Sequence, residues 1–304
     1  MSIVSIDQAV KLLKAGTPVA LPTETVYGLA APIDQPQALK KVFEIKKRPL
    51  TDPLIVHVSS VEMAKTLFLN FDDNLQRLAE HFWPGPLTLV AKKNKSLVSD
   101  LITSGFDTVA VRIPASKIFK EVIEKTGAPL AAPSANLFKK VSPTSAHHIL
   151  ETLPGVNVID GGRCEVGIES TIYDVSSRQI LRPGDITHDQ IENLLNNKIT
   201  YTEKNYTPGS EAEHYRPSVP VLVFDNKKKI QFELNLQDGS VELQLDPNPK
   251  IAARNFYSDL RKYDKAEHTQ ILIYYDSNWT DTNWNALKNR LLKTASKWIQ
   301  TDEK

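Results

Sequence analysis

The sequence predicts an α/β protein in which helices cover a sheet, followed by a smaller α/β unit near the C-terminus. Three observations support this prediction. Short apolar strands alternate with amphipathic helices up to about residue 195, without long runs of strands. Segment 197–219 is polar and lacks periodicity. A new apolar strand then begins at Val219 and is followed by further α/β elements. We therefore expect a first domain over 1–196, a linker or lid over 197–219 and a second domain over 220–304.

Apolar spacing and capping residues define the helices of the first domain. Ser5 and Gln8 form a capping-box pattern before the first amphipathic stretch. Ser60 and Ser116 occupy N-cap positions, and Pro143 is expected to open a helix in its first turn. On this basis, helices are predicted over 6–15, 37–47, 60–68, 72–82 and 116–126, from 143, and over 187–195.

The predicted strands are short runs rich in β-branched and aliphatic residues. In the first domain they are expected over 19–21, 53–58, 87–92, 109–113, 130–132, 156–159, 170–175 and 179–182. In the second domain, strands are expected over 219–224 and 271–275, and a helix over 284–299.

Composition excludes several classes of protein. Hydrophobic residues make up 41% of the 304 residues, which is enough for a packed core. The net charge of +1 provides no overall field toward nucleic acid or membrane. Cys164 is the only cysteine, so an intrachain disulfide and a cysteine zinc site are excluded. We find no signal-peptide pattern and no apolar run near the roughly 20 residues of a membrane helix, so we expect a cytoplasmic protein without membrane contact.

A dense polar segment follows the first predicted strand. Residues 21–30 are L-P-T-E-T-V-Y-G-L-A. Ligands of open α/β sheets bind at such carboxyl ends of strands, and these side chains could fix a small zwitterion. Taken alone, a strand-to-helix turn with Thr23 or Thr25 as the N-cap is the simpler explanation.

A basic cluster ends the helix predicted over 37–47. Lys46, Lys47 and Arg48 precede Pro49. Cations are favoured at a helix C-terminus, which is one explanation. The other is a phosphate-binding site, in which Pro49 forces the chain out of the helix and Arg48 binds phosphate oxygens bidentately.

Four later segments combine small and polar residues. In A-A-P-S-A-N (131–136), Ser134 and Asn136 offer both donors and acceptors. Ser142 precedes the helix expected at Pro143, where an anion could bind. Segments 161–172 (G-G-R-C-E-V-G-I-E-S-T-I) and 181–184 (L-R-P-G) complete the set. Turn and cap chemistry, or an ion pair for Arg182, would explain each of them separately.

Arg112 and His57 lie inside predicted strands. Alternation in T-V-A-V-R-I-P (108–114) places Arg112 among apolar residues. Because an uncompensated buried charge is costly, a carboxylate of the protein or of a ligand must pair with it. A single strand histidine such as His57 is more often structural than catalytic.

The chain lacks G-x-x-x-x-G-K-[ST], G-x-G-x-x-G, H-E-x-x-H and G-x-S-x-G. Any nucleotide must therefore bind without a standard phosphate loop.

Nine short motifs occur in one order over about residues 3–195. They are P-T-E-T-V-Y-G-L, K-x-R-P, P-L-I-V-H, W-P-G-P-L-T, V-A-V-R-I-P, A-P-S-A-N, S-P-T, G-x-E-S-T-I and L-R-P-G. This set resembles the YrdC family of threonylcarbamoyl-AMP synthases. Residues 207–217 resemble the interdomain linker of its long, two-domain members, and 220–304 resemble a shortened form of their Rossmann-like C-terminal domain. The resemblance implies a YrdC-like twisted open mixed sheet with flanking helices.

The resemblance also implies roles for individual residues. L-threonine or its threonylcarbamoyl group is expected to contact Thr25, His57, Arg112, Ala132 and Ser170. ATP is expected to contact Arg48, Asp52, Thr108, Ser134, Ser142, Arg182 and Tyr215. The characteristic polar tetrad, which we take as catalytic, corresponds to Lys46, Arg48, Ser134 and Asn136. Arg112 is suited to bind the threonine carboxylate. Asp52 replaces the asparagine of many members, so Mg²⁺ or Lys47 would have to offset its charge beside a triphosphate.

The implied reaction consumes L-threonine, bicarbonate or CO₂, and ATP, and needs no nucleophilic side chain. The threonine amine captures CO₂, the resulting carboxylate attacks the α-phosphate, and pyrophosphate leaves. Positioning and charge neutralisation by protein cations and Mg²⁺ would supply most of the catalysis. The product would pass to the transferase machinery that modifies adenosine in tRNA. Because the carbamate hydrolyses readily, we expect linker 201–217 to act as a lid, with Tyr215 and Arg216 reaching the ATP.

Two other functions compete with this hypothesis. An RNA-binding module of the same fold would show a broad basic face with aromatic residues, whereas here the basic residues flank threonines and serines. A weak RNA contact remains compatible with the sequence. Adenylation of carbamoyl phosphate would be accompanied by zinc-finger or acylphosphatase segments, and the single cysteine excludes the zinc fingers.

Overall fold

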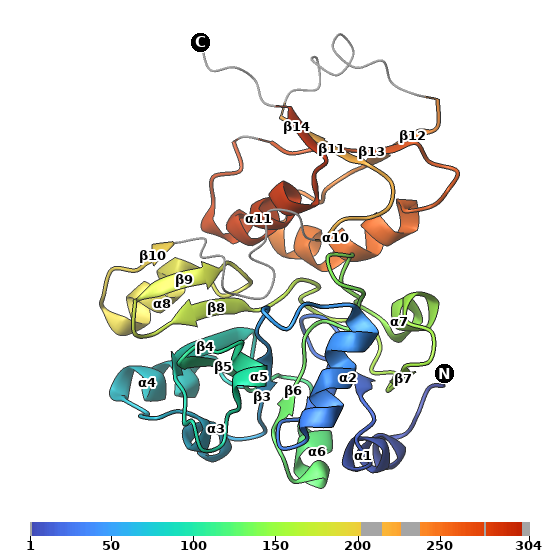
Figure 1. The fold of residues 1–304 in the computed structure, drawn as a ribbon. Coiled ribbons are helices and arrows are strands. Elements are labelled where there is room, and N and C mark those ends of the chain that lie inside the picture. The colour runs from blue at the N-terminus through green and yellow to red at the C-terminus, as the bar shows by residue number, and fades with distance from the viewer. Residues whose placement is uncertain (1, 202–214, 226–237, 277, 300–304) are drawn as a thin grey trace.

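The computed structural model describes residues 2–201, 215–225, 238–276 and 278–299. Within these residues, the strands form one sheet of ten strands and a second sheet of four, and helices pack against them. Figure 1 shows the larger sheet with its helices in the lower part of the molecule and the smaller sheet above it. Helices α10 (Pro249–Tyr263) and α11 (Asn285–Thr294) lie between the two sheets. The predicted α/β fold with two sheets is confirmed.

The first part of the chain contains eight helices among its described residues. They are α1 (Ile6–Lys14), α2 (Pro36–Lys46), α3 (Val61–Leu67), α4 (Asp73–Phe82), α5 (Asp100–Thr103), α6 (Lys117–Thr126), α7 (Ala146–Thr152) and α8 (His188–Leu195). The predicted capping box is confirmed, because the Ser5 backbone N–H donates to Gln8 Oε1 at 2.8 Å and the Gln8 N–H donates to Ser5 Oγ at 3.3 Å. Ser60 and Ser116 cap α3 and α6 as predicted.

The large sheet is mixed, with the order β10-β9-β8-β4-β5-β3-β6-β2-β1-β7. Its strands are β1 (Val19–Leu21), β2 (Gly28–Pro32), β3 (Ile55–His57), β4 (Leu87–Lys92), β5 (Thr108–Arg112), β6 (Leu130–Ala131), β7 (Asn157–Val158), β8 (Thr171–Asp174), β9 (Gln179–Arg182) and β10 (Thr200–Tyr201). Strands β3 and β5 are parallel, and their register places His57 beside Arg112. Two predicted site residues therefore end neighbouring strands in the middle of the sheet.

The small sheet is entirely parallel, with the order β12-β13-β11-β14. Its strands are β11 (Val221–Phe224), β12 (Ser240–Leu243), β13 (Gln270–Tyr274) and β14 (Lys297–Ile299), and a short 3₁₀ turn, η1 (Thr282–Trp284), precedes α11. Val221 and Val223 pack in one cluster with residues of α10 and α11, whereas Leu222 and Phe224 pack in another. Parallel strands with helices between them fit the expected Rossmann-like unit.

The core beneath α10 and α11 crosses from one sheet region to the other. Val26, Val141 and Ile168 of the first part share a cluster with Phe256 and Leu287 of the two helices. Gly167 lies at the contact with φ +78°, and a Cβ there would lie 2.4 Å from the carbonyl oxygen of Arg254. Only glycine accommodates both this backbone conformation and this approach of α10.

Several predicted elements were wrong. No helix begins at Pro143, because α7 begins at Ala146 after its N-cap, Ser145. The Pro143 carbonyl instead accepts the Tyr27 N–H at 2.9 Å, which holds this segment against the 23–28 turn. The helix predicted over 284–299 ends at Thr294, and β14 follows it. Elements β2, α5, β10, β12, α10 and η1 were not predicted from the sequence.

The predicted linker is only partly described. Its first residues form β10, which pairs with β9. Residues 202–214, the middle of the predicted lid, lie outside the described residues, so the lid stays a prediction, as do the domain boundaries. In the part of the chain that the structure describes, no helix has the length and apolarity to cross a membrane.

Candidate active site

The predicted polar turns meet in one pocket at an edge of the large sheet. It forms where β1, β3, β5, β6 and β9 end and where β2 and β8 begin, which is the usual ligand edge of an α/β sheet. The pocket is partly open to solvent. It is lined by Thr23, Thr25, Val26, Gly28, Arg48, Ile55, His57, Arg112, Ala132, Pro133, Ser134, Glu169, Ser170, Arg182 and Tyr215.

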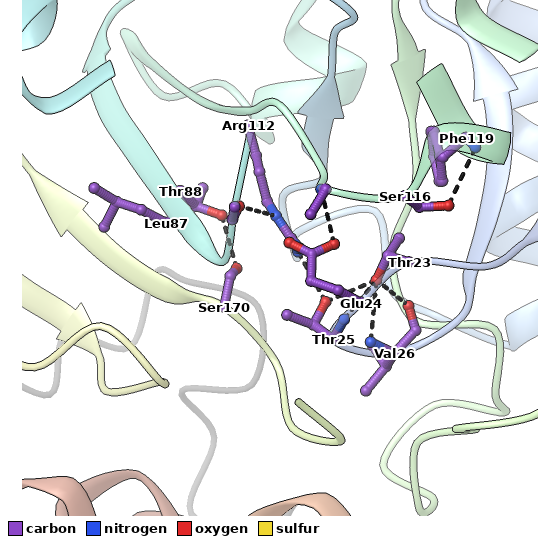
Figure 2. Close-up of polar contacts among 12 residues, drawn as sticks. Thr23, Glu24, Thr25, Val26, Leu87, Thr88, Arg112, Ser116, Phe119 and Ser170 are labelled. Carbon is purple, nitrogen blue, oxygen red and sulfur yellow. Dashed lines mark hydrogen bonds and ion pairs between the residues drawn. The ribbon is translucent and has the colours of Figure 1, made fainter. Parts of the chain in front are cut away.

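Thr23 organises the turn that follows β1. Its Oγ1 accepts the backbone N–H groups of Thr25 and Val26, both at 3.1 Å, and donates to the Val26 carbonyl at 2.6 Å. The Thr23 and Thr25 hydroxyls lie 2.8 Å apart. The polar segment is therefore a turn between β1 and β2 (Figure 2), and the helix that Thr23 or Thr25 would cap is absent there. The turn also lines the pocket.

Arg112 extends from the end of β5 into this turn (Figure 2). Its Nη1 donates to Thr25 Oγ1 at 2.9 Å, and its Nε donates to the Gly85 carbonyl at 3.0 Å. Its Nη2 lies 2.5 Å from Glu24 Oε1, and the other oxygen of Glu24 accepts the Ala115 N–H at 3.0 Å. The carboxylate that Arg112 requires is thus present in the protein, although the sequence also allowed a ligand to supply it.

Lys46 and Asn136 shape the turn that presents Ser134 to the pocket. The buried Lys46 ammonium donates to the carbonyls of Ser134 and Asn136 at 2.6 and 2.5 Å. Asn136 Nδ2 donates to the carbonyls of Leu137 and Lys140. Burial lowers the pKa of Lys46 well below its usual value, and the charge of Arg48 lowers it further. Both side chains therefore lie behind the wall that Ser134 lines.

Arg48 lines the pocket after the end of α2. Lys47 ends that helix in the left-handed conformation, with φ 52°. Arg48 Nη2 pairs with Asp52 Oδ2 at 2.8 Å and donates to the Pro53 carbonyl at 2.8 Å. The charge of Asp52 is thus offset by Arg48. The sequence had led us to expect that Mg²⁺ or Lys47 would offset it.

His57 is a neutral imidazole in the pocket wall. Burial lowers its pKa to about 3, and the charge of Arg112 adds to this effect. Its ring packs against Phe119 with centroids 4.9 Å apart, and its Nδ1 has no hydrogen-bond partner among the described residues. His57 can therefore offer a ligand a neutral donor or acceptor, but it carries no charge at neutral pH.

Ser170 and Arg182 also line the pocket. Arg182 donates from Nε to the Ser170 carbonyl and from Nη2 to Ser170 Oγ, both at 3.1 Å. The Ser170 hydroxyl also lies 2.7 Å from Thr88 Oγ1 (Figure 2). These contacts fix a guanidinium and a hydroxyl at the ends of β9 and β8.

Glu169 is a buried carboxylate next to Ser170. Ser142 Oγ donates to its Oε1 at 2.6 Å, while Tyr257 OH at 2.9 Å and Arg290 Nε at 3.0 Å donate to its Oε2. Burial alone would raise the pKa of this carboxyl, but Arg290, Arg182 and Ser142 hold it at about 2. Glu169 is therefore ionised at neutral pH, and two of its partners come from α10 and α11.

Tyr215 also joins the pocket to the second part of the chain. It is buried, has φ 60°, and packs 5.5 Å from the Tyr257 ring and 5.6 Å from the Arg290 guanidinium carbon. Burial raises its pKa to about 12, and the charge of Glu169 acts in the same direction. Its phenol is thus a neutral group at the pocket.

The structure brings most predicted site residues together. Those that line the pocket are Thr25, Arg48, His57, Arg112, Ala132, Ser134, Ser170, Arg182 and Tyr215. Lys46, Asp52, Asn136 and Ser142 each contact a lining residue from behind. Thr108 is not brought to the pocket, because it begins β5 while Arg112 ends it, roughly 13 Å away along the strand.

Comparisons with known proteins show the family of this chain. The Sua5/YciO/YrdC family model, described as telomere recombination, matches residues 11–184, more than half of the chain. The chain belongs to this family. A second model, described as the threonylcarbamoyl-AMP synthase C-terminal domain, matches residues 186–296. The resemblance to long, two-domain family members is thus confirmed.

Among relatives, a threonylcarbamoyl-AMP synthase of Pyrococcus abyssi is 42% identical over 233 residues, which cover 72% of this chain and 68% of the relative. One of Bacillus subtilis is 38% identical over 228 residues, which cover 72% of this chain and 66% of the relative. The crystal structure of P. abyssi Sua5 complexed with L-threonine matches with a TM-score of 0.89 and 32% identity, covering 99% of both chains. The sequence alignments thus span about two thirds of these relatives, whereas the structural match extends over both parts of the chain.

Four residues at or next to the pocket were not assigned a role from the sequence. Glu24 and Glu169 lie inside the motifs quoted above, which was the available signal in the sequence. In the structure they are buried beside Arg112 and Ser142, respectively. Tyr257 lies on α10, which was missed entirely. Arg290 shares a helix face with Leu287 and Leu291, and a basic residue on an apolar face was the signal there.

A protein-held Mg²⁺ finds few ligands at this site. Among the described residues, no group of three or more His, Cys, Asp or Glu side chains could hold a metal ion. Near the pocket, Glu24, Asp52 and Glu169 are each paired with an arginine. The donor set therefore does not fit a dedicated metal site.

Proposed function

We propose that this protein joins L-threonine, bicarbonate or CO₂, and ATP into threonylcarbamoyl-AMP with release of pyrophosphate. Support comes from the family membership and from relatives named threonylcarbamoyl-AMP synthase. The observation that carries the proposal is a single pocket with two chemically different walls. One wall offers hydroxyls and a neutral imidazole beside a paired arginine, and the other offers guanidinium groups.

The first wall fits a small zwitterion. Thr25, His57 and Arg112 supply hydrogen bonds, and Ala132 leaves room beside the backbone. Because Glu24 already balances Arg112, the threonine carboxylate would share this guanidinium with Glu24. His57 is neutral, so it does not repel the amine as that group loses its proton and attacks CO₂.

The second wall fits the phosphates of ATP. Arg48 and Arg182 present guanidinium groups, which bind phosphate oxygens well, and Ser134 adds a hydroxyl. We assign the carbamate attack on the α-phosphate to the space between the two walls. There the protein positions the two substrates and neutralises the charge that develops on the pyrophosphate. Lys46 and Asn136 act by holding the Ser134 turn, and Mg²⁺ would arrive with ATP as part of that substrate.

The product is an activated acyl-adenylate, which suits transfer to adenosine of tRNA by a separate transferase. Purified protein should therefore release pyrophosphate from ATP only when threonine and bicarbonate are both present. Mass spectrometry with labelled bicarbonate should place the label in the product. Equal pyrophosphate release without threonine would contradict the proposal.

A further inference from the structure

Arg290 reaches from the second part of the chain to the base of the pocket. It lies on α11, is fully buried at 0% exposure, and bonds to Glu169 through two of its nitrogens. Nε donates to Glu169 Oε2 at 3.0 Å, and Nη2 donates to the Glu169 carbonyl at 3.3 Å. Nη1 donates to the Pro183 carbonyl at 2.6 Å. In Figure 1, α11 lies close to β8 and β9, whose ends carry these acceptors.

Arg290 contacts the residues next to Ser170 and Arg182, which line the wall that we assign to ATP. Residue 169 directly precedes Ser170, and residue 183 directly follows Arg182. Arg182 is itself bonded to Ser170 by two hydrogen bonds. Arg290 thus holds the main chain on both sides of the Ser170–Arg182 pair, so its loss would loosen two lining residues together.

Glu169 also lines the pocket, so its charge matters to an anionic ligand. The charged and titratable groups that face it are Arg290 of α11, Arg182 of β9, Tyr257 of α10 and Tyr215. With Arg290 present, the Glu169 pair is neutral, and Arg182 remains as net positive charge for phosphate. Without Arg290, a buried carboxylate would stand beside the triphosphate, in surroundings where water screens charges poorly.

We propose that Arg290 is a positioning residue of the ATP site, supplied by the second domain. It cancels the charge of Glu169 and fixes the ends of β8 and β9 that carry Ser170 and Arg182. The second domain is therefore part of the nucleotide site through this side chain. The inference rests on the proposed function only for the identity of the ligand as a nucleoside triphosphate.

The test is ATP affinity measured by calorimetry on the full chain, without threonine. Arg290→Met should weaken ATP binding at least about tenfold, which corresponds to about 1.4 kcal/mol. The double variant Glu169→Gln/Arg290→Met removes both charges and should restore the affinity to within about threefold of wild type. Arg163→Met is the matched control. It removes an Arg163–Asn255 hydrogen bond of 2.6 Å to α10 without touching Glu169, so its ATP affinity should equal that of wild type.

A pH series separates this role from a merely structural one. In Arg290→Met, the pKa of Glu169 rises because its main cation is gone, so Glu169 becomes ionised at a higher pH than in the wild type. The loss of ATP affinity should therefore grow with pH in this variant. The double variant controls for the titration of ATP itself and should show no added slope.

Two results would overturn the proposal. The first is a folded Arg290→Met protein with wild-type ATP affinity. The second is a double variant as weak as Arg290→Met, because Glu169 would then be irrelevant. If Arg290→Met fails to fold, the double variant, which buries no unpaired charge, is compared with wild type instead, and an ATP affinity more than about tenfold weaker would overturn the proposal. Failure of both to fold would assign Arg290 to stability alone. Since ATP binding is measured without turnover, these outcomes are independent of whether threonine-dependent pyrophosphate release is observed.

Discussion

Two buried glutamate–arginine pairs border the pocket, and they join different parts of the chain. Glu24 and Arg112 both belong to the large sheet region and lie 2.5 Å apart at the wall assigned to threonine. Glu169 and Arg290 lie 3.0 Å apart at the wall assigned to ATP, and Arg290 comes from α11 of the second part. The chemistry of the two pairs is the same, but only the second depends on docking between the two regions.

This difference indicates how the site divides its tasks. The threonine wall is complete within the large sheet region, because its hydroxyl, imidazole and ion pair come from Thr25, His57 and the Glu24–Arg112 pair. The ATP wall also depends on Tyr215, Tyr257 and Arg290, which all lie after residue 214 in the sequence. We therefore expect changes at the contact between the regions to affect ATP first.

The largest expected effect is on threonine binding, at the Glu24–Arg112 pair. Arg112→Met alone would leave Glu24 buried and unpaired, so the double variant Glu24→Gln/Arg112→Met is preferred. It should weaken threonine binding by about 2–5 kcal/mol, as measured by calorimetry. ATP affinity should change much less. Unchanged threonine affinity in the folded double variant would remove Arg112 from the threonine site.

The next effect tests docking itself. Gly167→Ala introduces a Cβ 2.4 Å from the Arg254 carbonyl oxygen at φ +78°. It should lower the free energy of unfolding by about 3 kcal/mol, from the clash and the left-handed backbone together. Gly162 has the same φ of +78° with nothing within 4 Å, so Gly162→Ala is the matched control. That control should cost only about 1 kcal/mol. Equal losses in urea denaturation would show that the contact with α10 contributes nothing.

A smaller effect concerns pH and stability. The pKa of Glu169 is held at about 2, below the ordinary value of 4.5. An acid whose pKa is depressed by folding stabilises the protein above its unfolded pKa, and this contribution is lost as the pH falls through the folded value. The wild type should therefore lose about 2 kcal/mol from this group between pH 4.5 and pH 2, measured by urea denaturation. The Glu169→Gln/Arg290→Met variant should lack this component, and an identical pH slope in both proteins would contradict the pairing.

The smallest expected effect is at Thr108. Because Thr108 begins β5 at the end remote from Arg112, Thr108→Ala should change ATP affinity by less than about threefold, or about 0.7 kcal/mol. Ser134→Ala, which alters a pocket hydroxyl, should weaken ATP more than this. A tenfold loss of ATP affinity in Thr108→Ala would show that Thr108 contacts ATP, as the family resemblance implies, and would contradict its position in the structure.

Much of the fold followed from local signals in the sequence. Capping residues such as Ser5, Ser60 and Ser116 predicted where helices begin. Strand β2 was missed because its sequence, G-L-A-A-P, has low β-propensity and is held by its neighbours β1 and β6. Pro143 carried a helix-start signal, but its carbonyl bonds to Tyr27, so tertiary contact overrode the local preference.

The candidate site was predictable where one motif carried the chemistry. Thr25, Arg48 and Arg112 were located from their segments and do line the pocket. The partners of buried charges were not predictable, because pairing depends on contacts between distant residues. Arg290 is 121 residues from Glu169, and no local pattern links the two.

The most direct test of this division is to measure both ligands on both disrupted pairs. Threonine and ATP affinities would be determined by calorimetry for Glu24→Gln/Arg112→Met and for Arg290→Met. We predict opposite effects on the two affinities. Glu24→Gln/Arg112→Met should lose threonine affinity and keep its ATP affinity. Arg290→Met should lose ATP affinity at least about tenfold and keep its threonine affinity to within about threefold. Loss of the same ligand in both variants would contradict this prediction.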